Sequence, residues 1–202
     1  MVVEESLLPP PFPGRQHGLV PSDAQCLEWM HAAGMEAHIR AHSSLVAVVA
    51  ETIAALAFEK GFNVDVQAVR ASALLHDIAK PHTIAYGGNH CQIGGAWVQH
   101  KTGNPAIAQG VIHHVCWPGP LDVRAYTLVL AVIYGDKRVR HETIVSLEER
   151  FQDLLERYGT TKDRKTLIQR AYDQTRAIEQ AFNRALEVNL HAYPFDRGRM
   201  VE

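Results

Sequence analysis

Apolar residues recur at intervals of three and four along much of the chain, the spacing that places side chains on one face of an α-helix. The clearest stretch covers residues 36–60, and Gly61 stands where a helix C-terminus favours glycine. Asp65 is placed to cap another helix, which we expect to reach Pro81. The same pattern predicts further helices at residues 24–33, 91–101 and 106–115.

Two later stretches complete the prediction of an all-α fold. Residues 122–134 are apolar and contain several valines, so their periodicity fits either a helix or a strand. We expect a helix there, because every neighbouring segment is helical. Residues 146–190 show a charged amphipathic pattern that is interrupted at residues 159–161, which predicts two helices packed back on the domain.

The chain is expected to have three parts. Prolines near the N-terminus disfavour helix, so residues 1–22 are expected to form an extended N-terminal arm. With 202 residues and a hydrophobic fraction of 47%, the chain is long enough to bury the core of one domain, which we place at residues 23–145. Residues 146–202 would form a C-terminal helical extension packed on that domain.

Composition and charge narrow the function classes. A formal net charge of −2 gives no excess of basic residues, so nucleic-acid binding is unsupported. We find no apolar run of about 20 residues and no basic start typical of a signal peptide, so we expect a soluble cytoplasmic protein without a membrane segment. The three cysteines are widely spaced and fit neither a disulfide framework nor a paired-cysteine zinc motif, so we expect them to be reduced bystanders.

The twelve histidines are clustered rather than scattered, and acidic residues accompany them on separate predicted elements. Neutral imidazole nitrogens and carboxylate oxygens hold the divalent metals that activate water, and in helical proteins they are drawn from several helices. The sequence therefore predicts a metal site. Its candidate residues are His42, His76, Asp77, His90, His113, His114 and Asp136.

The order and spacing of His42, the pair His76-Asp77 and the distant Asp136 resemble the HD superfamily of metal-dependent phosphohydrolases. The stretches Ala-Leu-Leu-His76-Asp77-Ile-Ala-Lys80 and Tyr134-Gly-Asp136-Lys137-Arg138 are similar to the second and last motifs of that family. The resemblance covers roughly residues 38–140. It implies an all-α HD-domain helical bundle, carrying here the N-terminal arm and the C-terminal helical extension.

Members of this family that hold two metals have additional histidines between the His-Asp pair and the last Asp, and His90 and His113 stand at those positions. The chain is similar to the small bacterial members that split dinucleoside polyphosphates such as diadenosine tetraphosphate. Members with a glycine-tyrosine-proline motif, which cleave cyclic di-guanylate, can place a glutamate for a third metal where this chain has His38. The motif is absent, so we expect His38 beside the ligands or on the surface.

A role for each candidate follows from its chemistry. We expect His42, His76 and Asp136 to bind a first metal and His90 and His113 to bind a second, while the two oxygens of Asp77 bridge both ions. Adjacent helical residues diverge by about 100°. His76 and Asp77 therefore require either two neighbouring metal positions or a distorted helix end before Pro81.

Basic residues beside these motifs are candidates for contacts with substrate. Lys80 lies one helical turn beyond the His-Asp pair and would stabilise phosphate charge or assist proton transfer, which makes Asp77 and Lys80 the candidate catalytic residues. A solvated charge at a helix end is an equally good interpretation of Lys80. The expected substrate contacts are Lys137 and Arg138 as phosphate clamps and His114, which is alternatively a third ligand.

These residues predict a metal-dependent phosphohydrolase that uses metal-activated water to cleave a phosphomonoester or phosphoanhydride, in a small phosphorylated substrate such as a nucleotide. The cofactor would be one or two divalent transition metals, and iron, manganese, zinc and nickel all suit the ligands. Two alternatives stay open: a catalytically silent regulatory HD module that binds metal and nucleotide, and a helical interaction protein whose histidines merely pack. The oligomeric state also stays open.

Overall fold

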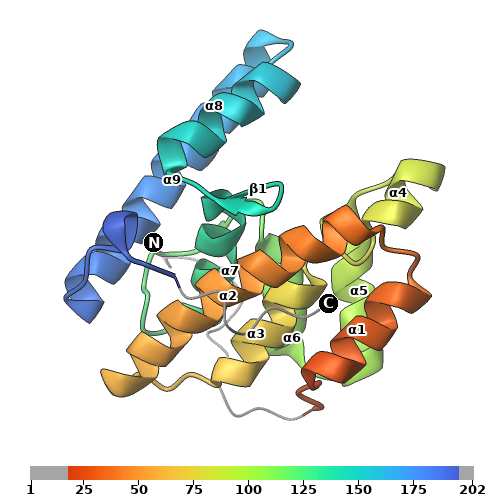
Figure 1. Ribbon diagram of the computed structural model, residues 1–202, viewed down its shortest axis with the longest axis horizontal. Coiled ribbons are helices and arrows are strands. Elements are labelled where there is room, and N and C mark those ends of the chain that lie inside the picture. Colours follow the sequence, from red (N-terminus) through yellow and green to blue (C-terminus); the bar gives the residue numbers. More distant parts are fainter. Residues whose placement is uncertain (1–17, 196–202) are drawn as a thin grey trace, which may run out of the picture.

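The computed structural model describes residues 18–195, which fold almost entirely into helices (Figure 1). The expectation of an all-α fold is confirmed. A two-residue antiparallel hairpin, in which Val139 pairs with Ile144, adds only a minor sheet. The elements in chain order are α1 (Asp23–Ala32), α2 (Ala37–Glu59), α3 (Val66–Leu75), α4 (Lys80–Tyr86), α5 (His90–Thr102), α6 (Pro105–His113), α7 (Thr127–Arg138), β1 (Val139–Arg140), β2 (Thr143–Ile144), α8 (Leu147–Tyr158), α9 (Lys162–Leu186) and the 3-10 helix η1 (Leu190–Ala192).

Helix α2 is the centre of the bundle, where α3 and α7 pack against it. Its residues 42–50 are all buried. Gly135 allows α7 to come close to α2, because a Cβ atom at this position would lie 2.9 Å from the backbone oxygen of Val46. The sequence places His42 one turn before Val46 and Asp136 directly after Gly135, so this close contact brings two candidate ligands together.

Helix α2 is also long and apolar enough to meet the length and composition of a membrane span, contrary to our expectation from the sequence. In its most apolar stretch, however, 61% is buried against the rest of the protein. A core helix of a soluble protein meets the same criterion, so this feature is weak evidence for a membrane segment.

Capping side chains set the starts of α1 and α3, and the cap at Asp65 is the one that the sequence predicts. The Asp65 side chain accepts a hydrogen bond from the backbone N–H of Ala68 at the start of α3, and Ser22 caps α1. The expected helix at residues 122–134 is present as α7, which begins at Thr127.

The segment around Pro81 differs from the prediction. Helix α3 ends at Leu75, a tight turn follows, and Pro81 lies in the first turn of the unpredicted helix α4. Proline is favoured in the first turn of a helix, where its missing N–H is not needed. Within the turn, the N–H of Ile78 donates to Leu75 and that of Lys80 donates to Asp77. The His-Asp pair therefore lies outside regular helix, in a distorted helix end, which is one of the two arrangements expected from the sequence.

The C-terminal helices form a hairpin in which α8 and the first half of α9 project from the bundle (Figure 1). The second half of α9 packs against α7, where the hydroxyl of Tyr134 donates to Glu179 at 2.7 Å and Phe182 is fully buried. The proposed division into arm, domain and extension stays a prediction, and most of the arm lies outside the described residues.

Phe182→Ala should destabilise the protein by about 3–5 kcal/mol, because it removes an aromatic ring from the contact that attaches α9 to the bundle. Urea unfolding followed by circular dichroism measures this change. Arg170→Ala, an exposed position on the same helix, serves as the control and should alter the free energy of unfolding by less than about 0.5 kcal/mol. Equal effects of the two substitutions would contradict the assigned packing.

Candidate metal centre

Six polar side chains from five separate parts of the bundle converge at its centre. They come from α2, the turn after α3, the first residue of α5, the end of α6, and α7. All are buried except the half-buried His90. The six are His42, His76, Asp77, His90, His114 and Asp136.

The first group consists of His42, His76 and Asp136, whose ligand atoms lie within 4.8 Å of one another. His42 Nε2 is 3.2 Å from Asp136 Oδ1, and His76 Nε2 is 3.8 Å from the same oxygen. These atoms are close enough to share one cation.

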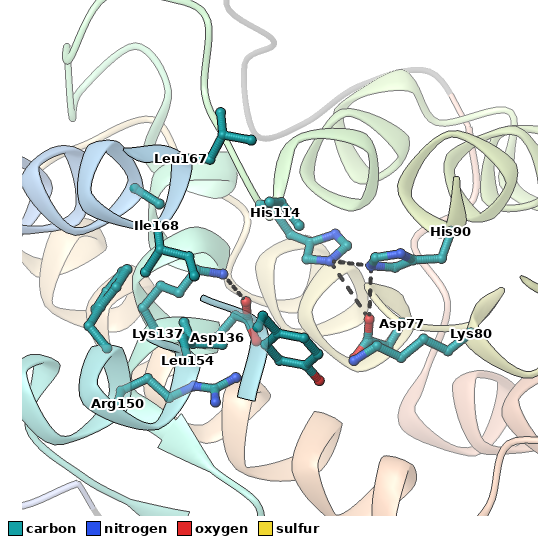
Figure 2. Close-up of a pocket in the computed structure, with 14 residues that line it drawn as sticks. Asp77, Lys80, His90, His114, Asp136, Lys137, Arg150, Leu154, Leu167 and Ile168 are labelled. Atoms are coloured by element: carbon teal, nitrogen blue, oxygen red, sulfur yellow. Dashed lines mark hydrogen bonds and ion pairs between the residues drawn. The ribbon is translucent and has the colours of Figure 1, made fainter. Parts of the chain in front are cut away.

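The second group consists of His90 and His114. Asp77 lies between this group and the first. His90 Nε2 and His114 Nε2 are 3.2 Å apart, and they lie 3.5 Å and 3.7 Å from Asp77 Oδ1 (Figure 2). The other carboxylate oxygen, Asp77 Oδ2, lies 3.1 Å from His76 Nε2. Each oxygen of Asp77 therefore faces a different group of histidines.

Backbone carbonyls orient two of the imidazoles. The Nδ1–H of His76 donates to the carbonyl of Ala73, and that of His114 donates to the carbonyl of Val111, both at 2.7 Å. A ring whose Nδ1 carries the proton presents the lone pair of Nε2 as a ligand. Burial, together with the charge of His76, lowers the pKa of His114 to about 3, so this ring is neutral at physiological pH.

Both carboxyl groups are held in the ionised form. Burial alone would raise the pKa of Asp77, but the neighbouring His76 outweighs it and holds that pKa well below the usual value. Burial alone would also raise the pKa of Asp136. The ammonium group of Lys137 and the ring of His42 outweigh it and hold that pKa well below its usual value. The centre thus carries two buried negative charges.

Unsatisfied polar atoms show that a cation fits this centre. Among the residues that the structure describes, His76 Nε2 and Asp77 Oδ1 are buried and have no hydrogen-bond partner. An unpaired buried carboxylate oxygen is costly, because it has lost its water and gained nothing in return. A divalent cation would satisfy both atoms, and imidazole and carboxylate are ligands that such cations accept.

Comparison with known proteins agrees with this geometry. The HD domain family matches residues 39–154, more than half of the chain, and all six converging residues lie inside the match. The chain belongs to the HD domain family. HD domains bind divalent metals, and the two groups of ligands described above are where this HD domain could hold them.

Other comparisons add little to this assignment. No curated protein matches the chain significantly. A solved structure of a predicted HD superfamily hydrolase from an uncultured Thermotogales bacterium is similar, with 18% identity over 80% of this chain and 91% of the other and a TM-score of 0.47.

The structure corrects the placement of His113, the residue that we expected to bind the second metal. His114 lies in the cluster, whereas the His113 ring packs edge-on against Trp117 at a centroid distance of 5.3 Å. Regular helix α6 ends at His113, and adjacent residues there point in directions about 100° apart. Of these two adjacent rings, the structure places only His114 at the centre of this HD domain.

The structure also corrects the expectation that Arg138 binds phosphate. Its guanidinium group is buried and donates hydrogen bonds to the Tyr134 hydroxyl and to the backbone oxygens of Val145 and Leu190. Arg138 thus fastens the segment after α9 to α7. His38 is exposed and lies 3.3 Å from Glu36, outside both groups of ligands.

A cavity of about 410 Å³ opens directly over the two groups (Figure 2). Lys80 and Lys137 line it beside the ligands, where Lys80 Nζ lies 2.6 Å from Asp77 Oδ2 and Lys137 forms an ion pair with Asp136. A large part of the lining comes from α8 and α9 and is mostly apolar. Its residues include Phe151, Leu154, Leu167 and Ile168, with Arg150 at its edge.

Arg150 is a cavity residue that the sequence did not reveal. It stands in the amphipathic tail, 14 residues after Asp136, and only the fold brings it to the cavity. Its Nη1 donates to Asp153 at 2.8 Å, and its buried Nε has no partner among the described residues. No local motif marks such a residue in the sequence.

His114→Ala should weaken the binding of a divalent metal by at least about tenfold, because it removes a ligand from the second group. His113→Ala is a matched control at the adjacent position and should leave metal affinity unchanged. Calorimetric titration of the metal-free protein with Mn²⁺ or Zn²⁺ compares the two variants. If His113→Ala lost more metal affinity than His114→Ala, His113 would be the ligand, as expected from the sequence.

Proposed function

We propose that this HD domain protein is a metal-dependent phosphohydrolase that cleaves a phosphomonoester or phosphoanhydride, with a nucleotide as substrate. The observation that carries the proposal is that two groups of ligands share Asp77 at the base of an open cavity. His42, His76 and Asp136 would hold one metal, His90 and His114 the other, and Asp77 both.

Divalent metals held at this place would lower the pKa of a bound water and polarise the phosphoryl oxygen. Iron, manganese, zinc and nickel all suit a set of imidazole and carboxylate ligands. The membership of the chain in the HD domain family supports this chemistry.

The lysines and Arg150 would bind the phosphate group. Burial alone would lower the pKa of Lys80, but Asp77 outweighs it and raises that pKa above the ordinary value, which favours Lys80 as a cation rather than as a base. Lys137 also lines the cavity, and the buried Nε of Arg150 has no hydrogen-bond partner among the described residues. Fixed positive groups of this kind stabilise the charge that develops on a reacting phosphoryl group.

The apolar wall of α8 and α9 would bind the leaving group. Phe151, Leu154 and Ile168 offer a surface for the face of a nucleobase. Leu154 and Ile168 lie across the cavity from Asp77 and Lys80 (Figure 2). The three apolar side chains have no donors or acceptors for base edges, so they would contribute affinity without selecting one base. This arrangement supports a nucleotide over a simple sugar phosphate.

The proposal is tested by assaying purified protein, loaded with Mn²⁺, against p-nitrophenyl phosphate, nucleoside monophosphates and dinucleoside polyphosphates. Phosphate release should occur, and Asp77→Ala and His76→Ala should each reduce kcat/KM by at least about a hundredfold, because both lose ligands. Circular dichroism checks that the variants keep their helices. Activity that survives both substitutions would assign the hydrolysis elsewhere, and bound metal without turnover of any substrate would favour the regulatory module.

The role of the apolar wall is tested with two substrates that differ only in the base. AMP should exceed ribose 5-phosphate in kcat/KM by about tenfold or more, and Leu167→Asp should reduce this ratio to below about threefold. Leu167 is 62% exposed, so the substitution spares the fold. Gln169→Asp adds the same charge at an exposed position that does not line this cavity, and it should preserve the ratio. Equal rates on both substrates in the wild type would remove the wall from substrate binding.

A further inference from the structure

Cys91 lies directly against the second group of ligands, although the sequence suggested only a bystander. It follows His90 at the start of α5 and is 8% exposed. Its Sγ atom is 3.6 Å from His90 Nε2 and 3.9 Å from His114 Nε2, and the two nitrogens are themselves 3.2 Å apart. The three atoms therefore form a compact triangle that holds two imidazoles and one thiol.

The sides of this triangle fit a shared metal ion. Metal–nitrogen bonds of about 2.1 Å and a metal–sulfur bond of about 2.3 Å, set at tetrahedral angles, place nitrogen and sulfur about 3.6 Å apart and two nitrogens about 3.4 Å apart. The separations around Cys91 match these values to within about 0.3 Å. No large movement is needed for the thiol to bind together with His90 and His114.

A second observation marks the same point as a place for a cation. Asp77 Oδ1 is buried without a hydrogen-bond partner among the described residues, and it faces both imidazoles at 3.5 Å and 3.7 Å. Two nitrogens and a sulfur thus form one triangle, and the oxygen faces both of its nitrogens. His90, His114 and Asp77 line the cavity but Cys91 does not, so the thiol would bind from the interior and leave the cavity side to water and substrate.

Burial opposes a negative charge on the sulfur and raises the pKa of the Cys91 thiol to about 11, so a bound cation would have to displace the thiol proton. Cys91 lies in the first turn of α5, a helix of 13 residues, where the helix dipole offsets part of this cost. Asn89 caps this helix and accepts a hydrogen bond from the N–H of Cys91 at 2.9 Å, which fixes the backbone that carries both Cys91 and His90.

We propose that Cys91 is a thiolate ligand of the second metal, completing a shell with His90, His114 and Asp77. The proposal rests on the metal centre of the proposed function. The sulfur–metal bond forms as the thiol proton leaves to solvent, so no electron is transferred. A thiolate favours thiophilic ions such as zinc over manganese, which prefers oxygen ligands.

Absorption spectroscopy of the full-length protein loaded with Co²⁺ tests the sulfur bond directly. The wild type should show the intense near-ultraviolet charge-transfer band of a cobalt–thiolate bond, and Cys91→Ser should lose it. Cys116→Ser is the matched control, because this exposed cysteine lies outside the cluster, and it should keep the band. A wild type without the band, or a band that persists in Cys91→Ser, would overturn the proposal.

X-ray absorption of the zinc-loaded wild type gives a test that needs no variant, in case Cys91→Ser fails to fold. A sulfur neighbour at about 2.3 Å supports the proposal, whereas only nitrogen and oxygen neighbours at about 2.0–2.1 Å would overturn it. In Cys91→Ser, zinc affinity should fall by about tenfold to a hundredfold while manganese affinity stays unchanged. Phosphatase activity without a sulfur neighbour would reject the thiolate and keep the proposed function.

Discussion

Two ionised carboxylates at the centre of an apolar bundle are the constraint on which the rest of the structure depends. Asp77 and Asp136 are 1% and 7% exposed, and a buried charge is tolerated only when other groups compensate for it. Each carboxylate pairs with a lysine close to it in the sequence, whereas most of the imidazoles around them come from elements that are far apart. The core must therefore hold α2, α3 and α7 in one relative position, or Asp136 would lose its contacts with His42 and His76.

The regular elements could be predicted because they depend on local patterns. The apolar stripe of α2 and the cap at Asp65 are visible in any short window of the sequence, and the structure contains both. Helix α4 could not be predicted in this way, because Pro81 can either end one helix or begin the next, and tertiary contacts decide between the two. The turn that results places His76 and Asp77 where both can face the centre.

Only those residues of the candidate site that belong to sequence motifs could be predicted. His42, His76, Asp77 and Asp136 share a recognisable order, and the structure brings them together. The choice between His113 and His114 depends on one step of rotation at the end of α6, which no periodicity resolves. Arg150 and the apolar wall belong to a hairpin whose direction is set by packing on α7. Much of this wall lies beyond residue 154, outside the family match.

The close contact at Gly135 makes the metal centre sensitive to a residue that is not itself a ligand. A methyl group at this position would lie 2.9 Å from the backbone oxygen of Val46, so even alanine forces α7 and α2 apart. Metal bonds tolerate displacements of only about 0.2 Å. A change from glycine to alanine at residue 135 is small in the sequence, yet it would strain the contact between the two helices that carry His42 and Asp136.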